Sequence, residues 1–139
     1  MKHLTALIVF SLFLISCQTK ISREQMAHLN GYWQIEKVMT ADGEQKDYQA
    51  NTSYDFFEIN GDKGFRAKVM PQLDGSFITN NLKEQILVTY EQDGTFLNYV
   101  TQYAKWREQI KTLTEDELVV ENAQKIEYHY KKAGPINLD

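Results

Sequence analysis

The chain has 139 residues, of which 42% are hydrophobic and 24% charged, and its formal net charge at pH 7 is −4. This length suits one globular domain with a single hydrophobic core. The Lys and Arg residues form no basic stripe, which argues against nucleic acid as a partner. Because Cys17 is the only cysteine, an internal disulfide is excluded and burial of hydrophobic side chains has to stabilise the fold.

The N-terminal segment has the pattern of a secretory signal peptide. A basic start, Met1 to His3, precedes an apolar run from Leu4 to Ser16, which is shorter than the roughly 20 residues of a membrane-spanning helix. The run ends in Leu-Ile-Ser-Cys at residues 14–17. This ending resembles the lipobox of bacterial lipoproteins, in which the cysteine becomes the acylated first residue of the mature chain. The resemblance implies removal of residues 1–16 and fatty acyl groups such as palmitate at Cys17.

The alternative for Cys17 is an unmodified thiol, with cleavage elsewhere. An unpaired thiol is unusual in an exported protein, and no other small-residue cleavage site follows the apolar run. We therefore expect a lipid anchor in the cell envelope. Gln18 follows the cysteine, in place of the Asp that would indicate inner-membrane retention in some bacteria, and this favours the outer membrane of a Gram-negative bacterium.

The rest of the chain divides into a tether, one domain and a tail. We assign residues 17–25 to the acylated N-terminus and tether, 26–133 to the folded domain and 134–139 to the tail. Ser22-Arg23-Glu24-Gln25 has the form of a capping box, which predicts a short helix through Leu29. Asn30-Gly31 ends this helix.

From Tyr32 onward the sequence has the rhythm of successive β-hairpins. Four Asp-Gly or Asn-Gly pairs, at residues 42–43, 60–61, 74–75 and 93–94, mark tight turns. Asn80-Asn81, Glu115-Asp116 and Ala123-Gln124 fit three further turns. Segments between them alternate apolar and polar residues, as half-buried antiparallel strands do. The predicted strands are 32–40, 53–59, 64–70, 76–79, 85–91, 95–101, 103–113, 117–122 and 125–132.

Eight or nine short strands in adjacent hairpins predict an all-β, up-and-down antiparallel barrel. Closure of the barrel removes the two exposed sheet edges that an open sheet would leave. A β-sandwich is the competing architecture, but it usually needs a long crossover connection. Only the segment 41–52 has the length for one.

Alternation along the strands also predicts which side chains face the barrel interior. The candidate cavity-lining residues are Phe65, Ala67, Val69, Trp106, Tyr128 and Tyr130. Arg107 and Glu108 are neighbours in one strand and must point to opposite faces. One of the two is therefore expected to be a buried charge that needs a partner, and the sequence leaves open which.

A Gly-x-Trp motif opens the first strand directly after the predicted helix. Gly31-Tyr32-Trp33 resembles the signature of lipocalins, and the resemblance covers residues 26–133. It implies an eight-stranded barrel whose Trp33 plugs the closed end beneath a basic residue from the last strand. Parity along that strand favours Lys132 as this residue, with Lys131 as the alternative. The sequence is most similar to small lipocalin-like lipoproteins of Gram-negative bacteria.

These observations favour a binding protein over an enzyme. The sequence contains no Cys-x-x-Cys, His-Glu-x-x-His, Gly-x-Ser-x-Gly or phosphate-binding glycine motif, so we expect no catalytic residues, metal or cofactor. The first hypothesis is a monomeric, membrane-anchored barrel that holds a small apolar or amphipathic molecule. The second is a barrel filled by its own side chains, which acts on an envelope partner through its outer surface.

Overall fold

The computed structural model describes residues 20–48 and 53–134. Its elements are one short 3-10 helix, η1 (Gln25–Leu29), and nine strands. The strands are β1 (Gly31–Met39), β2 (Gln45–Asp47), β3 (Tyr54–Asn60), β4 (Lys63–Pro71), β5 (Phe77–Glu91), β6 (Gly94–Val100), β7 (Lys105–Leu113), β8 (Glu117–Glu121) and β9 (Glu127–Lys132).

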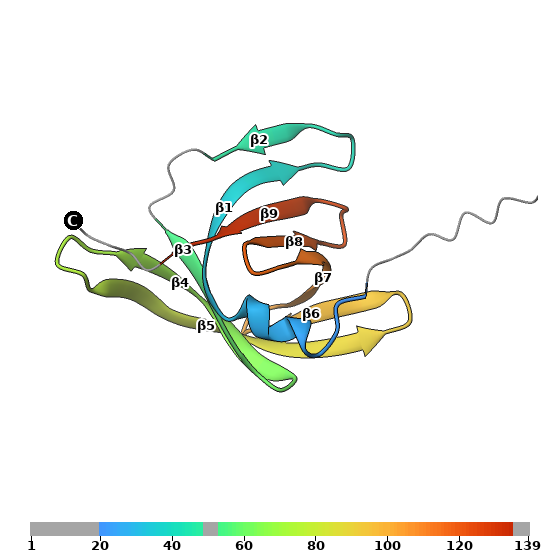
Figure 1. Cartoon of the computed structure of the whole chain (residues 1–139), viewed down its shortest axis with the longest axis horizontal. Coiled ribbons are helices and arrows are strands. Elements are labelled where there is room, and N and C mark those ends of the chain that lie inside the picture. The colour runs from blue at the N-terminus through green and yellow to red at the C-terminus, as the bar shows by residue number, and fades with distance from the viewer. Residues whose placement is uncertain (1–19, 49–52, 135–139) are drawn as a thin grey trace, which may run out of the picture.

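Eight of the strands close into an antiparallel barrel (Figure 1). Each strand from β3 to β8 pairs with the next in sequence, and β1 completes the ring by pairing with both β3 and β9. The short strand β2 pairs only with the far end of β1, as an addition to the barrel. The predicted up-and-down barrel is thus confirmed, and the closed ring leaves few unpaired strand edges.

The region around Asn80 differs from its prediction as a turn. Asn81 adopts a φ of 56°, but the chain continues in the same direction, and 77–91 form one long strand. Side-chain oxygens replace strand partners at this irregularity, because the Asn81 and Leu82 amides donate to Thr79 Oγ1 and Asn80 Oδ1 at 2.9 and 3.0 Å. As a result the β4–β5 hairpin is long and projects beyond the barrel (Figure 1). Strand β2 was not predicted at all.

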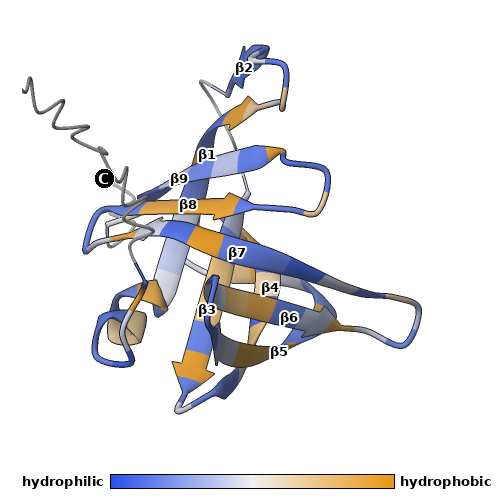
Figure 2. Ribbon diagram, turned by 90° about the vertical axis from the view of Figure 1, so that its right-hand side faces the viewer, coloured by the Kyte–Doolittle hydropathy of each residue, from blue (hydrophilic) through white to orange (hydrophobic). Residues whose placement is uncertain are grey.

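Hydrophobic and hydrophilic residues alternate along the strands, and the hydrophobic core lies inside the barrel (Figure 2). Helix η1 covers one end, where its Met26 and Leu29 join the core beside Trp33. The chain before η1 is also fixed there, because Ile21 is buried and its carbonyl accepts a hydrogen bond from Thr95 Oγ1 at 2.9 Å. All barrel strands and core residues lie within 20–134, so a chain that starts at residue 18 contains the complete barrel.

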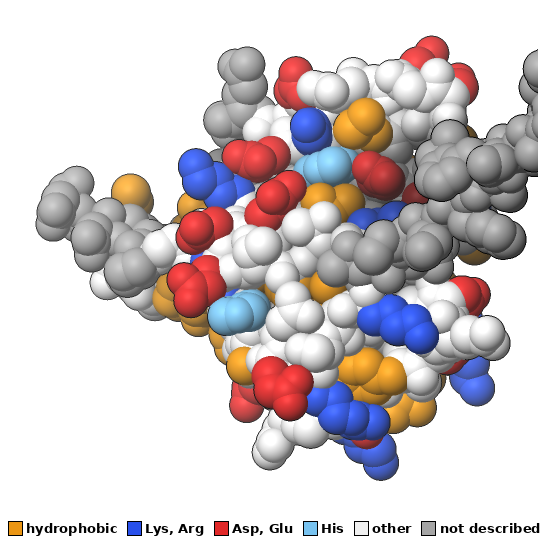
Figure 3. All heavy atoms as spheres, turned by 45° about the vertical axis from the view of Figure 1, so that its right-hand side comes forward, with side chains coloured by type: hydrophobic (Ala, Val, Ile, Leu, Met, Phe, Trp, Pro, Cys, Tyr) orange, Lys and Arg blue, Asp and Glu red, His pale blue; other side chains and the backbone are white. Residues whose placement is uncertain are grey.

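The outer surface is mixed in character. On the face drawn in Figure 3, charged side chains of both signs are spread over the barrel, and hydrophobic side chains appear as small patches. Within residues 20–48 and 53–134, no helix is long and apolar enough to cross a bilayer.

Candidate functional site

A cavity of about 720 Å³ occupies the barrel at the end opposite η1. Its wall is built by inward side chains of six strands, among them Ile35 of β1, Asp55 of β3 and Trp106 of β7. Leu82 and Tyr103 lie where the cavity meets solvent, and both are mostly exposed. The cavity therefore opens between the β5 irregularity and the β6–β7 turn.

An arginine whose side chain is only 16% exposed lies in the cavity wall. Arg66 Nε donates to Glu84 Oε2 at 2.5 Å, and its Nη1 lies 3.5 Å from Glu108 Oε1. The guanidinium also stacks over the ring of Tyr99, with 4.5 Å from Cζ to the ring centroid. Register explains the convergence, since Arg66 pairs directly with Glu84 across β4 and β5. Directly opposed residues share one face of the sheet.

A second ion pair lies beside the first. Lys68 Nζ lies 3.3 Å from Asp55 Oδ1. Burial and the nearby Asp55 carboxylate together raise the pKa of the Tyr130 hydroxyl well above its usual value. The two members of this pair differ in exposure, because Asp55 is buried while the Lys68 side chain is 59% exposed. Charged groups of this kind are costly to bury unless they are paired.

The carboxyl of Glu108 is the deepest acid in the wall. Burial raises its pKa above the ordinary glutamate value, while Arg66 and the Tyr99 hydroxyl act in the opposite direction. The Tyr99 hydroxyl is fully buried, and no hydrogen-bond partner of good geometry lies within reach in the described residues. Burial also raises the pKa of Tyr99 well above its usual value, so this hydroxyl stays neutral.

Aromatic side chains form the apolar part of the wall. Trp106, Tyr128 and Tyr130 all line the cavity, as their strand parity predicted. Trp106 stacks on Tyr99 with 5.1 Å between ring centroids. The cavity therefore combines aromatic surface with a buried cluster of charges.

The prediction that Phe65, Ala67 and Val69 line the cavity is wrong. Arg66 and Lys68, the alternate residues of β4, face inward, because they pair with Phe57 and Asp55 of the inner face of β3. Ala67 is buried on the outside instead, opposite Phe56. There the rings of Tyr32, Phe56, Phe65 and Phe77 form a chain of contacts with centroids 4.8 to 6.0 Å apart.

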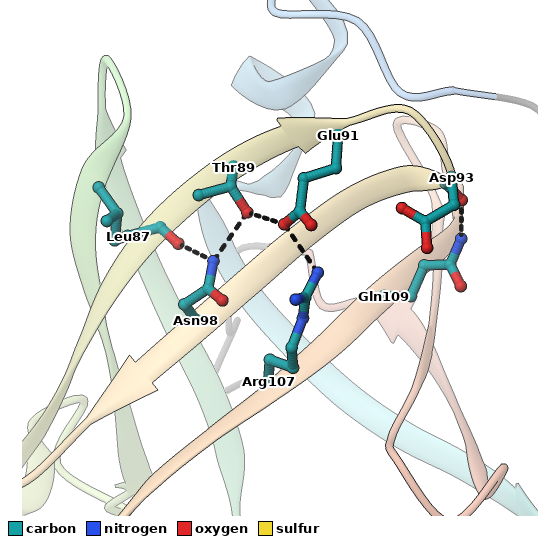
Figure 4. Close-up of polar contacts among 7 residues, drawn as sticks. All are labelled: Leu87, Thr89, Glu91, Asp93, Asn98, Arg107 and Gln109. Atoms are coloured by element: carbon teal, nitrogen blue, oxygen red, sulfur yellow. Dashed lines mark hydrogen bonds and ion pairs between the residues drawn. The ribbon is translucent and has the colours of Figure 1, made fainter.

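Of the two neighbours in β7, Glu108 faces inward and Arg107 outward. Figure 4 shows Arg107 on the outer face, where its Nη2 donates to Glu91 Oε2 at 2.8 Å. The same carboxylate accepts from Thr89, which in turn accepts from Asn98. The sequence reasoning identified Glu108 as one of two candidates but missed Asp55, Arg66, Lys68 and Glu84. The sequence signal that could have found them is a set of opposite charges on neighbouring strands, with basic residues on β4 and acidic residues on β3, β5 and β7.

The closed end of the barrel is organised by Trp33, which is fully buried. Its Nε1 donates to the Leu29 carbonyl at 2.8 Å, and Lys132 Nζ lies 4.4 Å from the centre of the ring. The same ammonium donates to the carbonyls of His28 and Asn30 at 2.8 and 2.5 Å. Register selects Lys132, which pairs with Trp33, whereas Lys131 pairs with Gln34.

Gly31 allows this arrangement because it has no side chain. Its φ is +118°, and a Cβ added there would lie 3.2 Å from Lys132 Cε. A larger residue would be strained in its backbone and would press on the lysine. Among the described residues, no group of three or more His, Cys, Asp or Glu side chains has the arrangement of a metal site.

Comparison with known proteins supports the assignment of the fold. A family profile of the lipocalin-like domain matches residues 29–120. A lipocalin-like protein from Bacteroides uniformis is 13% identical, with a TM-score of 0.48 over 76% of this chain and 99% of that one. An uncharacterized protein from Bacteroides eggerthii is 11% identical, with a TM-score of 0.50 over the same shares of both chains.

A more distant similarity is to apocrustacyanin C1, which is 9% identical, with a TM-score of 0.43 over 84% of this chain and 73% of that one. No curated protein matches this sequence. The structural similarities concern the fold alone, and the profile covers most of the barrel from Leu29 to Val120. This chain therefore belongs to the lipocalin-like domain family.

Proposed function

We propose that the protein is a lipid-anchored envelope protein that binds one small apolar or amphipathic molecule in its barrel, and that it is not an enzyme. The observation that carries this proposal is the cavity of about 720 Å³. Ligand sites typically measure about 300–1,000 Å³ and combine apolar walls with a few polar groups. A barrel filled by its own side chains would leave no such space, so the cavity favours binding over a purely external role.

We expect the neutral dye N-phenyl-1-naphthylamine to bind residues 18–139 with micromolar affinity and one-to-one stoichiometry. Burial of its apolar rings contributes about 25 cal/mol per Å². Summed over the buried area of the dye, this contribution exceeds the entropic cost of association by enough for a micromolar dissociation constant. The increase in dye emission measures binding. Quenching of Trp106, which lines the cavity, reports where the dye lies.

Two tryptophan substitutions test the location of the dye. Ile35→Trp adds bulk to the cavity wall and should abolish binding, whereas Val100→Trp adds similar bulk to the exposed outer face. Circular dichroism verifies that both variants fold, since overpacking costs about 1–3 kcal/mol. Undiminished binding by a folded Ile35→Trp variant would show that the dye lies outside the barrel and would contradict the proposal.

The membrane anchor is the second part of the proposal. Cys17 lies outside the described residues, and the support for its acylation is the apolar run that precedes it. Ile21 is buried at the closed end of the barrel. Four residues span at most about 14 Å, so acyl groups on Cys17 would hold the closed end near the bilayer. The cavity would then open away from that bilayer.

Cys17→Ala is expected to leave the protein unprocessed or to release it from the membrane fraction. The reason is that two or three acyl chains anchor a protein stably, at about 0.8 kcal/mol per buried CH₂. Metabolic labelling with an alkyne fatty acid, followed by membrane fractionation, measures both effects. Wild-type protein that is soluble and carries no label would contradict the anchor, and fractionation on a density gradient tests the outer-membrane location.

A further inference from the structure

Acidic groups outnumber buried cations in the cavity wall. Asp55, Glu84 and Glu108 line it, whereas Arg66 is the only arginine among the described lining residues and already contacts two of these carboxylates. The second cation, Lys68, is more than half exposed and contacts the third carboxylate. Both cations that face the cavity are therefore already in ion pairs.

A third cation of the lining, Lys83, does not change this balance. Lys83 contributes to the wall, but its Nζ lies 4.1 Å from the centre of the Phe65 ring, on the outer face of the barrel. An anionic ligand would have to displace a carboxylate from Arg66 or Lys68. A cationic ligand meets three carboxylates that share two cations, and it can approach them without displacing either cation.

Two further observations point to a ligand with a hydrogen-bonding cation and an apolar body. The fully buried Tyr99 hydroxyl lies next to Glu108, and within residues 20–48 and 53–134 it makes no hydrogen bond of good geometry. Buried polar groups in native proteins are normally satisfied, and an exception requires an explanation. In addition, Trp106, Tyr128 and Tyr130 present aromatic rings to the same cavity, and such rings attract cations. Burial raises the pKa of Glu108 although Arg66 lowers it, so a further cation beside this carboxyl would favour its charged form.

We infer that the cavity selects an amphipathic organic cation, with a protonated amine near Glu108 and an aromatic or aliphatic body against Trp106, Tyr128 and Tyr130. This inference rests on the proposed function, because it specifies the ligand class of the same cavity. The amine would balance the excess carboxylate and supply donors to Glu108, while the body would replace water against the aromatic wall.

Three probes that differ only in their polar group test the inference. Residues 18–139 are titrated at pH 7 with 1-naphthylmethylamine, 1-naphthalenemethanol and 1-naphthaleneacetate, and isothermal calorimetry measures each dissociation constant. We expect the amine to bind about tenfold more tightly than the alcohol, the usual gain of a hydrogen bond to a charged group over a neutral one. We expect the carboxylate to bind most weakly.

The outcomes separate the ligand class from the proposed function. If none of the probes binds, small-molecule binding itself is contradicted. If the alcohol or the carboxylate binds as tightly as the amine, the cavity binds small molecules but the inferred charge preference is wrong. This comparison uses the wild-type chain and so does not depend on the folding of any variant.

A matched pair of variants tests the role of Glu108. Glu108→Gln keeps the shape of the side chain and removes its charge, so the amine should lose most of its tenfold advantage while the alcohol binds as before. Glu91→Gln makes the same change on the outer face, beside Arg107 (Figure 4), and should leave all three constants unchanged. An amine preference that survives in folded Glu108→Gln would overturn the placement of the amine.

Discussion

Trp33→Ala is expected to lower the free energy of unfolding by about 3–5 kcal/mol, the usual range for the loss of a large buried aromatic side chain. Trp33 is fully buried, and its ring contacts Lys132 on one face. The substitution leaves a cavity at the closed end and removes the hydrogen bond to the Leu29 carbonyl. It also removes the ring beneath the Lys132 ammonium, which lies among backbone carbonyls.

Urea denaturation of residues 18–139 measures this loss. Tyr103→Ala is a suitable control, because Tyr103 is 87% exposed and substitutions at exposed sites usually change stability by less than about 0.5 kcal/mol. A loss below about 1 kcal/mol for Trp33→Ala would contradict a closing role for this residue. The total stability of a domain is about 5–15 kcal/mol, so the expected loss is a large part of it.

Arg66→Met is expected to destabilise the barrel by about 3–5 kcal/mol at pH 8, the typical cost of removing one partner from a buried ion pair. Methionine retains much of the apolar stem but leaves Glu84 and Glu108 without their shared cation. Glu108 is the more deeply buried of the two, and it would bear most of the cost of remaining ionised.

The loss should become smaller as the pH falls. Burial raises the pKa of Glu108 in the folded state above its ordinary value near 4.5, and removal of Arg66 raises it further. At pH values between the unfolded-state pKa and the raised folded-state pKa of Glu108, the folded state binds more protons than the unfolded state, so stability declines as the pH rises. This decline is larger in the variant, because its Glu108 has the higher folded-state pKa. Urea denaturation at pH 5 and pH 8 measures the difference.

Arg107→Met provides the matched control for Arg66→Met. Arg107 also pairs with a glutamate and lies over an aromatic ring, Phe96, but its ion pair is on the exposed outer face (Figure 4). Exposed ion pairs contribute about 0–1 kcal/mol, so we expect a small loss with little pH dependence. Equal losses for the two variants would contradict the interpretation that Arg66 compensates buried carboxylates.

Most of the barrel was predictable because its signals are local. The Asp-Gly and Asn-Gly pairs mark four hairpins, and in each of them the glycine has a positive φ. Asn80-Asn81 carried a similar signal but forms an irregularity inside β5, since the side chains of Thr79 and Asn80 satisfy the freed amides. A turn signal indicates where the backbone can leave regular strand geometry. Whether the chain then reverses depends on the neighbouring strand.

The sequence by itself determined the up-and-down connectivity of the barrel and the parity that places Tyr128 and Tyr130 in the cavity, because these depend on turns and alternation within a strand. The closed end at Trp33 was implied by the resemblance of Gly31-Tyr32-Trp33 to the lipocalin signature. Only the tertiary structure decided which face of β4 points inward. Alternation of Phe65, Ala67 and Val69 with Arg66 and Lys68 is compatible with either orientation. The choice is made by carboxylates from β3, β5 and β7, which meet Arg66 and Lys68 inside the barrel, while aromatic rings cover Ala67 outside. Charges can be buried only where their partners converge, and that convergence exists only once the barrel has closed.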